Sequence, residues 1–166
     1  MGLSLDVGCE HFKRGDIGVD YSRNSLADII ADAHHLPFKN ETFTKTISVT
    51  VLEHSPNPLN FLKEQYRVLK KGGEIEVTTD NAQYFSWSVM NFGRGGCRHE
   101  DYYADHFMIF YPKNVIRLLE LAGFKGISYH FIGRKTKIDS VVKLLIKLGI
   151  WRNDCQYFRF IVTAHR

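Results

Sequence analysis

Short apolar runs separated by glycine and acidic residues dominate the first 50 positions of the chain. Runs of this length are typical of strands that are buried on both faces of a parallel sheet. The β-branched residues of the last run also favour a strand. The pattern predicts four strands, at Leu3 to Val7, at Ile17 to Val19, within Ala27 to Ala31 and at Phe43 to Val51.

The connection between the first two strands, Gly8 to Asp16, is unusually short. A crossover between parallel strands normally takes a dozen or more residues and contains a helix. We therefore expect at most about one turn of helix in this connection. Because the first strand begins at Leu3, we also expect the sheet to be trimmed at its N-terminus, with a cleft that is open or covered by a partner subunit.

Apolar residues recur at helical spacing in three later segments. Asn57 is a candidate N-cap for a helix that begins at Pro58 and is closed by Lys70 to Gly72. A second helix opens at Tyr111-Pro112 and ends at Gly123, which suits the left-handed C-terminal position. An amphipathic helix is expected over Ile138 to Leu148.

Three further strands complete the expected architecture. Glu74 to Thr79 follows the first helix, whereas Ile127 to Phe131 and Phe158 to Val162 alternate apolar and polar residues, which suits an antiparallel pair. The order of elements predicts an α/β fold, a Rossmann-like and mostly parallel sheet of about seven strands with an antiparallel C-terminal edge. The length of 166 residues predicts a single domain over residues 1–166.

Composition narrows the class of protein. No apolar run approaches the roughly 20 residues of a membrane span, and the first residues do not resemble a signal peptide. Cys9, Cys97 and Cys155 are widely spaced, which suits reduced thiols. We expect a cytoplasmic protein. The net charge of +4 is scattered, so it gives little support to a nucleic-acid partner.

Acidic residues lie at the ends of three of the expected strands. Ligands of such sheets bind outside the carboxyl ends of the strands. Asp20 could accept the two hydroxyls of a ribose, and Asp32 could accept a hydrogen bond from an adenine amino group beside Ala33 and Leu36. A nicotinamide dinucleotide is disfavoured, because its G-x-G-x-x-G motif requires glycine at Glu10 and at Lys13.

Several segments, in this order, match one family. The chain resembles the class I S-adenosylmethionine-dependent methyltransferases, in particular the short, methyltransferase type 11-like group. The matching motifs are LDVGC at Leu5 to Cys9, GVD at Gly18 to Asp20, A-D-x-x-x-LPF at Ala31 to Phe38, VLEH at Val51 to His54, RVLKKGG at Arg67 to Gly73 and AGF at Ala122 to Phe124.

The resemblance implies S-adenosylmethionine as cofactor, with the methionine part near the first strand, the ribose at Asp20 and the adenine at Asp32. The cofactor-binding residues that it implies are Asp6, Gly8, Cys9, Asp20, Tyr21, Asp32, Ala33, Leu36 and Thr50. One position departs from the family. Glu10 occupies the place of a second glycine, and its carboxylate could repel the cofactor's carboxylate or meet its ammonium group.

His54 and His106 are the candidate catalytic bases, because histidine titrates near neutral pH. His54 could instead cap the following helix or order its loop. The aromatic-rich connection from Asp80 to Tyr111 is a candidate acceptor lid. Cys97, His99 and His106 match no common zinc spacing, so no metal site is predicted.

The sequence therefore predicts a methyltransferase that acts on an unidentified acceptor, such as a glycan, a small molecule or a protein, through an open cleft. The alternative is a catalytically inactive binding or regulatory subunit with the same fold. A nucleic-acid acceptor is disfavoured, because Thr50 to Glu53 differs from the motif of enzymes that methylate the amino groups of DNA. A homodimer is compatible with the open cleft.

Overall fold

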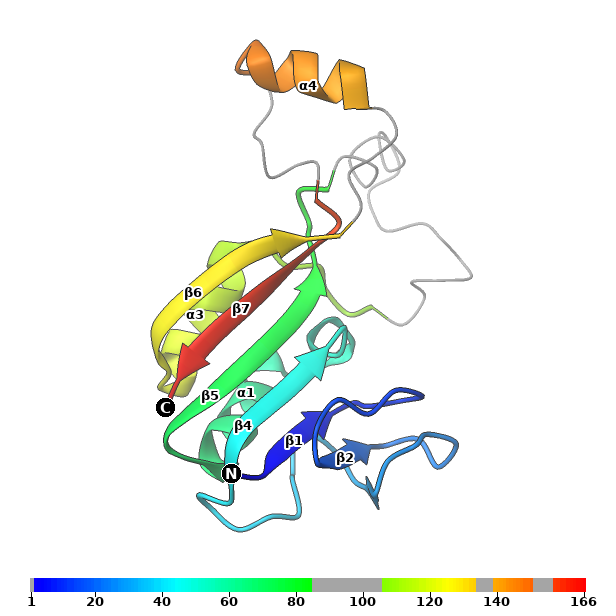
Figure 1. The fold of residues 1–166 in the computed structure, drawn as a ribbon, viewed down its shortest axis with the longest axis vertical. Coiled ribbons are helices and arrows are strands. Elements are labelled where there is room, and N and C mark those ends of the chain that lie inside the picture. Colours follow the sequence, from blue (N-terminus) through cyan, green and yellow to red (C-terminus); the bar gives the residue numbers. More distant parts are fainter. Residues whose placement is uncertain (1, 85–105, 134–138, 151–156) are drawn as a thin grey trace.

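The computed structural model describes residues 2–84, 106–133, 139–150 and 157–166. These residues form a seven-stranded sheet with the strand order β3-β2-β1-β4-β5-β7-β6 (Figure 1). The first five strands are parallel, and β7 is antiparallel to both of its neighbours. The strands are β1 (Ser4–Val7), β2 (Ile17–Asp20), β3 (Ile29–Ile30), β4 (Phe43–Val49), β5 (Leu69–Asp80), β6 (Lys125–Ile132) and β7 (Arg159–His165).

The sheet confirms the predicted α/β fold, mostly parallel with an antiparallel edge. As expected, residues 8–16 between β1 and β2 form no helix. The prediction for β4 was two residues too long. Its strand ends at Val49 because Thr50 adopts a φ of 55°, which a strand does not tolerate. The backbone then forms a short 3₁₀ helix, η1 (Leu52–His54).

Two helices cover one face of the sheet, α1 (Pro58–Val68) and α3 (Pro112–Ala122) (Figure 1). The side chain of Asn57 caps α1 by accepting a hydrogen bond from Asn60 N at 3.1 Å, as predicted. Gly123 ends α3 with a φ of 108°. The predicted end of α1 was wrong, since Leu69 is already extended and pairs with Phe43 in the sheet.

The hydrophobic core lies between these helices and the sheet. Apolar side chains of β1, β5 and β7 on this face pack with apolar side chains of α1 and α3. Those that are fully buried are Leu5, Val7, Phe61, Leu62, Ile75, Val77, Val115, Leu119, Phe160 and Val162. Burial of this kind stabilises the fold by about 25 cal/mol per Å² of apolar surface.

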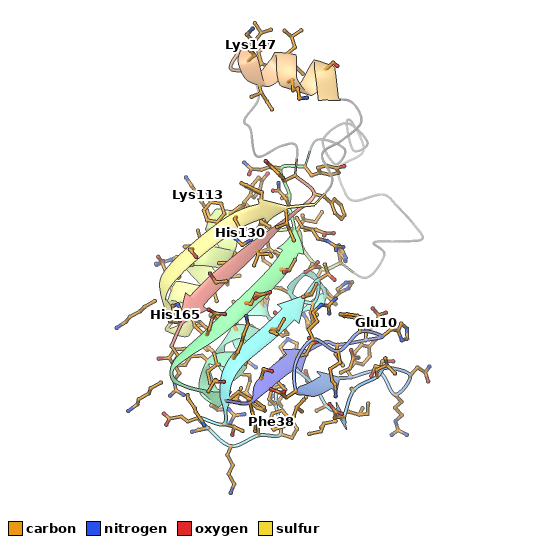
Figure 2. All side chains as sticks on the ribbon, in the orientation of Figure 1. Glu10, Phe38, Lys113, His130, Lys147 and His165 are labelled. Atoms are coloured by element: carbon orange, nitrogen blue, oxygen red, sulfur yellow. The ribbon has the colours of Figure 1, made fainter. Side chains whose placement is uncertain are left out.

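The opposite face of the sheet is polar. Lys45 Nζ forms ion pairs with Glu74 at 2.9 Å and with Glu76 at 2.8 Å, across β4 and β5. Figure 2 shows His130 and His165 on the antiparallel edge of the sheet, and both are exposed. In the described part of the chain, no helix packs on this face, and its side chains suit contact with water.

The last helix, α4 (Asp139–Lys147), stands apart from the sheet (Figure 1). Leu144 of α4 and Leu148 directly after it are more than half exposed, so these two apolar side chains are not buried on the sheet. None of the described helices combines the length and the apolar character that a membrane span requires. Most of the expected acceptor lid, including Cys97 and His99, lies outside the described residues.

Candidate cofactor site

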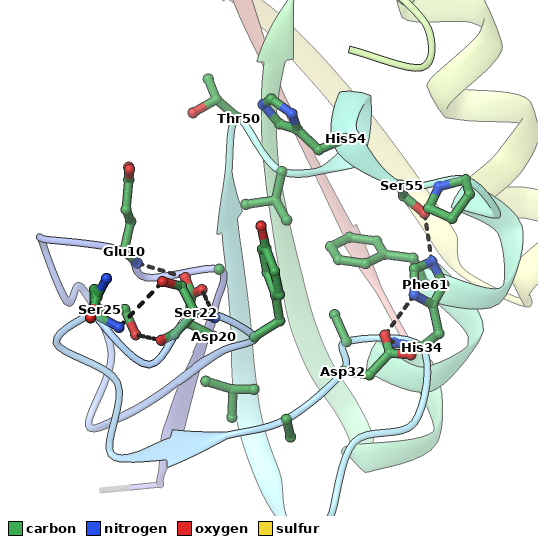
Figure 3. Close-up of a pocket in the computed structure, with 18 of the residues that line it drawn as sticks. Glu10, Asp20, Ser22, Ser25, Asp32, His34, Thr50, His54, Ser55 and Phe61 are labelled. Atoms are coloured by element: carbon green, nitrogen blue, oxygen red, sulfur yellow. Dashed lines mark hydrogen bonds and ion pairs between the residues drawn. The ribbon is translucent and has the colours of Figure 1, made fainter. Parts of the chain in front are cut away.

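A cavity of about 730 Å³ opens at the carboxyl ends of β1, β2, β3 and β4. This volume lies within the range of small-molecule sites, roughly 300 to 1,000 Å³. Its walls come from the segments that follow these four strands (Figure 3). Glu10 and Asp20 lie on one side, Asp32, His34 and Ser55 on another, and Thr50 and His54 along a third edge.

The backbone of Gly8 lies close against Val51, in the loop that follows β4. Its φ is 77°, and a Cβ atom built there would lie 2.4 Å from Val51 Cγ2. No side chain fits in that space without displacing Val51. Glycine is therefore required for both the left-handed backbone and the contact with the loop after β4. The same bare backbone lets a ligand approach the end of β1.

Asp20 organises the β1–β2 side of the cavity. Its Oδ2 accepts a hydrogen bond from Glu10 N at 2.9 Å, and its Oδ1 accepts one from Ser22 N at 2.8 Å. The residue is 8% exposed, so its carboxylate is held in one place. Each carboxylate oxygen keeps a further lone pair that can accept a hydroxyl.

Asp32 lies at the end of a hydrogen-bonded chain. Its Oδ1 accepts from His34 N at 2.8 Å and lies 2.7 Å from His34 Nδ1. His34 Nε2 in turn lies 2.7 Å from Ser55 Oγ. The backbone N–H of His34, above all, lowers the pKa of the Asp32 carboxyl, so this group is an anion that can accept hydrogen bonds.

Two side chains of α1 clamp the loop that carries Asp32. Glu64 Oε2 accepts from Leu36 N at 2.9 Å. Arg67 donates to the carbonyl oxygens of Leu36 at 2.9 Å and Phe38 at 2.7 Å, and it also pairs with Glu64 at 2.8 Å. The arginine of the RVLKKGG motif thus anchors the Asp32 side of the cavity to α1.

Glu10 has a backbone conformation that glycine would adopt more easily. Its φ is 42°, in the left-handed region, and its side chain is exposed at the rim of the cavity. The glutamate therefore bears a backbone strain on the order of 1 to 2 kcal/mol that glycine would avoid.

Glu10→Gly should raise the free energy of unfolding by about 1 kcal/mol, because glycine tolerates this φ. The variant should bind S-adenosylhomocysteine at least as tightly as the wild type, since a carboxylate at the rim is removed. Glu41→Gly is the matched control: Glu41 also has a positive φ, 58°, but does not line the cavity. Weaker binding by Glu10→Gly alone would instead indicate that Glu10 contacts the cofactor's ammonium group.

The cavity gathers six of the nine residues implied as cofactor ligands, namely Gly8, Asp20, Tyr21, Asp32, Ala33 and Thr50. The other three lie behind its wall. Asp6 is fully buried and accepts from Arg14 N at 2.6 Å, and burial raises the pKa of its carboxyl. Cys9 and Leu36 are buried in the interior. These three support the surrounding loops and do not line the cavity.

The two candidate bases lie side by side, although they are distant in sequence. His54 lines the cavity, and its ring centroid is 4.4 Å from that of His106. Their neighbour Glu53 is fully buried, and burial raises the pKa of its carboxyl to about 7. A second histidine and a buried carboxyl therefore lie behind the His54 end of the cavity.

Sequence reasoning missed Glu53, His34, Ser55 and the pair of Glu64 and Arg67. Four of these five residues lie within or beside the motifs, the exception being Glu64, but nothing local shows that His34 reaches Ser55 or that Glu53 is buried. Arg67 carries no local signal either, because it is not among the buried residues of α1 and its partners Leu36 and Phe38 come from a distant loop.

Residues 5–77 match the family described as a methyltransferase domain. An uncharacterized protein of Methanocaldococcus jannaschii is 32% identical over 159 residues, which cover 89% of this chain and 75% of that protein. A 2-methyl-6-phytyl-1,4-hydroquinone methyltransferase of Oryza sativa subsp. japonica is 33% identical over 63% of this chain. A ubiquinone/menaquinone biosynthesis C-methyltransferase of Brucella canis is 29% identical over 86%.

The chain spans only 27% of this rice enzyme and 57% of this Brucella enzyme. Among solved structures, an S-adenosylmethionine-dependent methyltransferase of Thermotoga maritima is similar over 99% of this chain and 82% of its own, with a TM-score of 0.72. At 18% identity this likeness shows a common fold.

Proposed function

The chain belongs to the class I S-adenosylmethionine-dependent methyltransferases of the type 11 group, and on this premise we propose that it transfers a methyl group from S-adenosylmethionine to an acceptor bound at the His54 end of its cavity. The observation that carries the proposal is the convergence of Gly8, Asp20 and Asp32 on one cavity, each from the end of a different parallel strand.

The residues of the cavity suit each part of this cofactor. Asp20 presents a fixed carboxylate to the ribose hydroxyls, and Asp32 presents a second to the adenine amino group. Gly8 presents bare backbone to the cavity at the end of β1, where the methionine part would lie. The fit is therefore good at three separate points of the cofactor.

S-adenosylmethionine, when bound, supplies an electrophilic methyl group on a sulfonium. The protein's part in an in-line displacement is to align the acceptor and exclude water. Where the acceptor carries a proton, His54 is placed to accept it, because it lines the cavity next to Thr50. The proton then leaves on the imidazole, and S-adenosylhomocysteine remains as the second product.

The acceptor class that the relatives support is an aromatic quinol. Two of them are named for methylation of a hydroquinone or for ubiquinone and menaquinone biosynthesis. Glycans, other small molecules and proteins remain acceptors to be compared with it in an activity screen.

The cofactor proposal is tested by calorimetric titration with S-adenosylmethionine and S-adenosylhomocysteine, with NADH as the control nucleotide. We expect micromolar binding of the two sulfur compounds alone. Asp20→Asn should weaken that binding about tenfold to a hundredfold, because its carboxylate would no longer accept both the loop N–H groups and the ribose hydroxyls.

Asp28→Asn is the control for a general loss of loop order. Asp28 accepts a hydrogen bond at 2.7 Å from the N–H of Gly18, which lies in β2 together with Asp20. Asp28 itself does not line the cavity. Its variant should bind the cofactor within about twofold of the wild type. Absence of binding by the folded wild type would instead support the non-catalytic subunit.

A further inference from the structure

A second cluster of chemically active side chains lies beside the cofactor cavity. Glu53 of η1, Asp80 at the end of β5 and His106 each offer one ligand atom, and these atoms lie within 4.8 Å of one another. Backbone contacts bring the three segments together. Phe107 N donates to Glu53 O at 2.9 Å, which holds the residue after His106 against η1.

Both carboxylates of this cluster are withdrawn from water. Glu53 is fully buried and Asp80 is 2% exposed. Glu53 Oε2 accepts from Thr79 Oγ1 at 2.8 Å, and Asp80 Oδ1 accepts from Arg159 Nε at 2.8 Å. Glu53 Oε1 is buried as well, yet within the described ranges no donor reaches it. A buried carboxylate oxygen without a donor is costly unless a cation satisfies it.

We propose that Glu53, Asp80 and His106 bind a divalent cation of the first transition row, of the Mn²⁺ or Zn²⁺ type. Two carboxylates and one imidazole are ligands that such ions accept. Around one ion, with bonds of about 2.1 Å, neighbouring ligand atoms lie about 3.0 to 3.4 Å apart. The three side chains, whose ligand atoms lie within 4.8 Å of one another, therefore need to close by at most about 1.4 to 1.8 Å.

This site differs from the expectation drawn from the sequence, which was that no metal is bound. That expectation tested Cys97, His99 and His106 against zinc spacings, where ligands are close in sequence. Glu53, Asp80 and His106 come from three distant segments. Their spacing in the sequence therefore gives no signal of a metal site. They come within reach of one another only because η1, the end of β5 and the segment before α3 meet in the folded chain.

The position of the cluster indicates what a bound cation would do. The ring of His106 contacts that of His54, which lines the cofactor cavity. A cation beside this histidine pair would bind an oxygen of the acceptor and make its hydroxyl more acidic. This role rests on the proposed methyltransferase function, whereas binding of the cation itself does not.

The test uses the full chain, freed of metal with EDTA and then titrated with MnCl₂ in the absence of cofactor. Electron paramagnetic resonance of free and bound Mn²⁺ should show one ion bound per chain. Glu53→Gln and Asp80→Asn should each weaken the binding at least about tenfold. Glu41→Gln and Asp28→Asn replace carboxylates outside the cluster and should leave it unchanged.

Two results would overturn the inference. The first is a folded wild type that binds S-adenosylhomocysteine but no Mn²⁺ and, in competition, no Zn²⁺. The second is Mn²⁺ binding that neither Glu53→Gln nor Asp80→Asn weakens. Mn²⁺ binding without S-adenosylhomocysteine binding would support the metal site and contradict the proposed methyltransferase, so the two failures are distinguishable.

Discussion

Gly8→Ala is expected to lower the free energy of unfolding by about 3 kcal/mol. The left-handed backbone at Gly8 costs an L-residue about 1 to 2 kcal/mol. The new Cβ atom would also lie 2.4 Å from Val51 Cγ2, and overpacking of this kind costs about 1 to 3 kcal/mol. Urea unfolding followed by circular dichroism measures the difference.

The same variant should bind S-adenosylhomocysteine roughly tenfold more weakly or worse, since the end of β1 must shift away from Val51. Gly72→Ala is the matched control for the backbone term. Gly72 has nearly the same φ, 75°, but no atom lies within 4 Å of the Cβ position. If Gly8→Ala costs no more stability than Gly72→Ala, the close contact with Val51 does not constrain the cavity.

A double variant separates the two terms of the Gly8 effect. Val51→Ala removes both of the Cγ atoms that the new methyl group would meet. Against the background of Val51→Ala, the Gly8→Ala change should therefore cost only the backbone term. An undiminished cost would assign the whole effect to the backbone.

Glu53→Gln is expected to stabilise the metal-free protein by about 3 kcal/mol at pH 8. Burial raises the pKa of Glu53 from 4.5 to about 7 in the folded state. The folded protein therefore binds this proton more tightly than the unfolded chain does. That contribution to stability is fully present below pH 4.5 and is lost as the pH rises through 7. The glutamine variant has no such loss.

The measurement is the free energy of unfolding of wild type and variant between pH 5 and pH 8 in EDTA, and the advantage of the variant should grow with pH. Glu64→Gln should change the free energy of unfolding in the opposite direction. A hydrogen bond from Arg67 lowers the pKa of Glu64, so the glutamine variant should be the less stable protein at neutral pH. A pH-independent difference for Glu53→Gln would contradict the burial of an ionisable carboxyl there.

The ends of elements show where local sequence signals stop being sufficient. Asn57 and Gly123 were correctly identified as the limits of α1 and α3, because capping depends on neighbouring residues. The end of α1 was predicted too late, since Lys70 and Lys71 are good helix formers. Pairing of Leu69 with Phe43 across the sheet outweighs that preference.

The sequence by itself determined the fold class and the edge of the sheet at which the cavity opens. The apolar runs before Asp20 and Asp32 indicate buried parallel strands, and the two acidic residues indicate where those strands end. Both signals lie within short segments, so the sequence alone is sufficient to read them. The motifs around them were also sufficient to indicate the family, whose membership the comparisons established.

Only the tertiary structure decided which side chains meet. His34 reaches Ser55, Arg67 holds the loop of Leu36, and Glu53 lies beside Asp80 and His106. The left-handed backbone of Glu10 is also established only by the structure, because the glutamate itself does not favour it; in the sequence only the glycine that the resembling family has at this position indicates it. Contacts of this kind depend on how distant segments cross at the end of the sheet. Periodicity and spacing describe single segments, so they carry no information on such crossings.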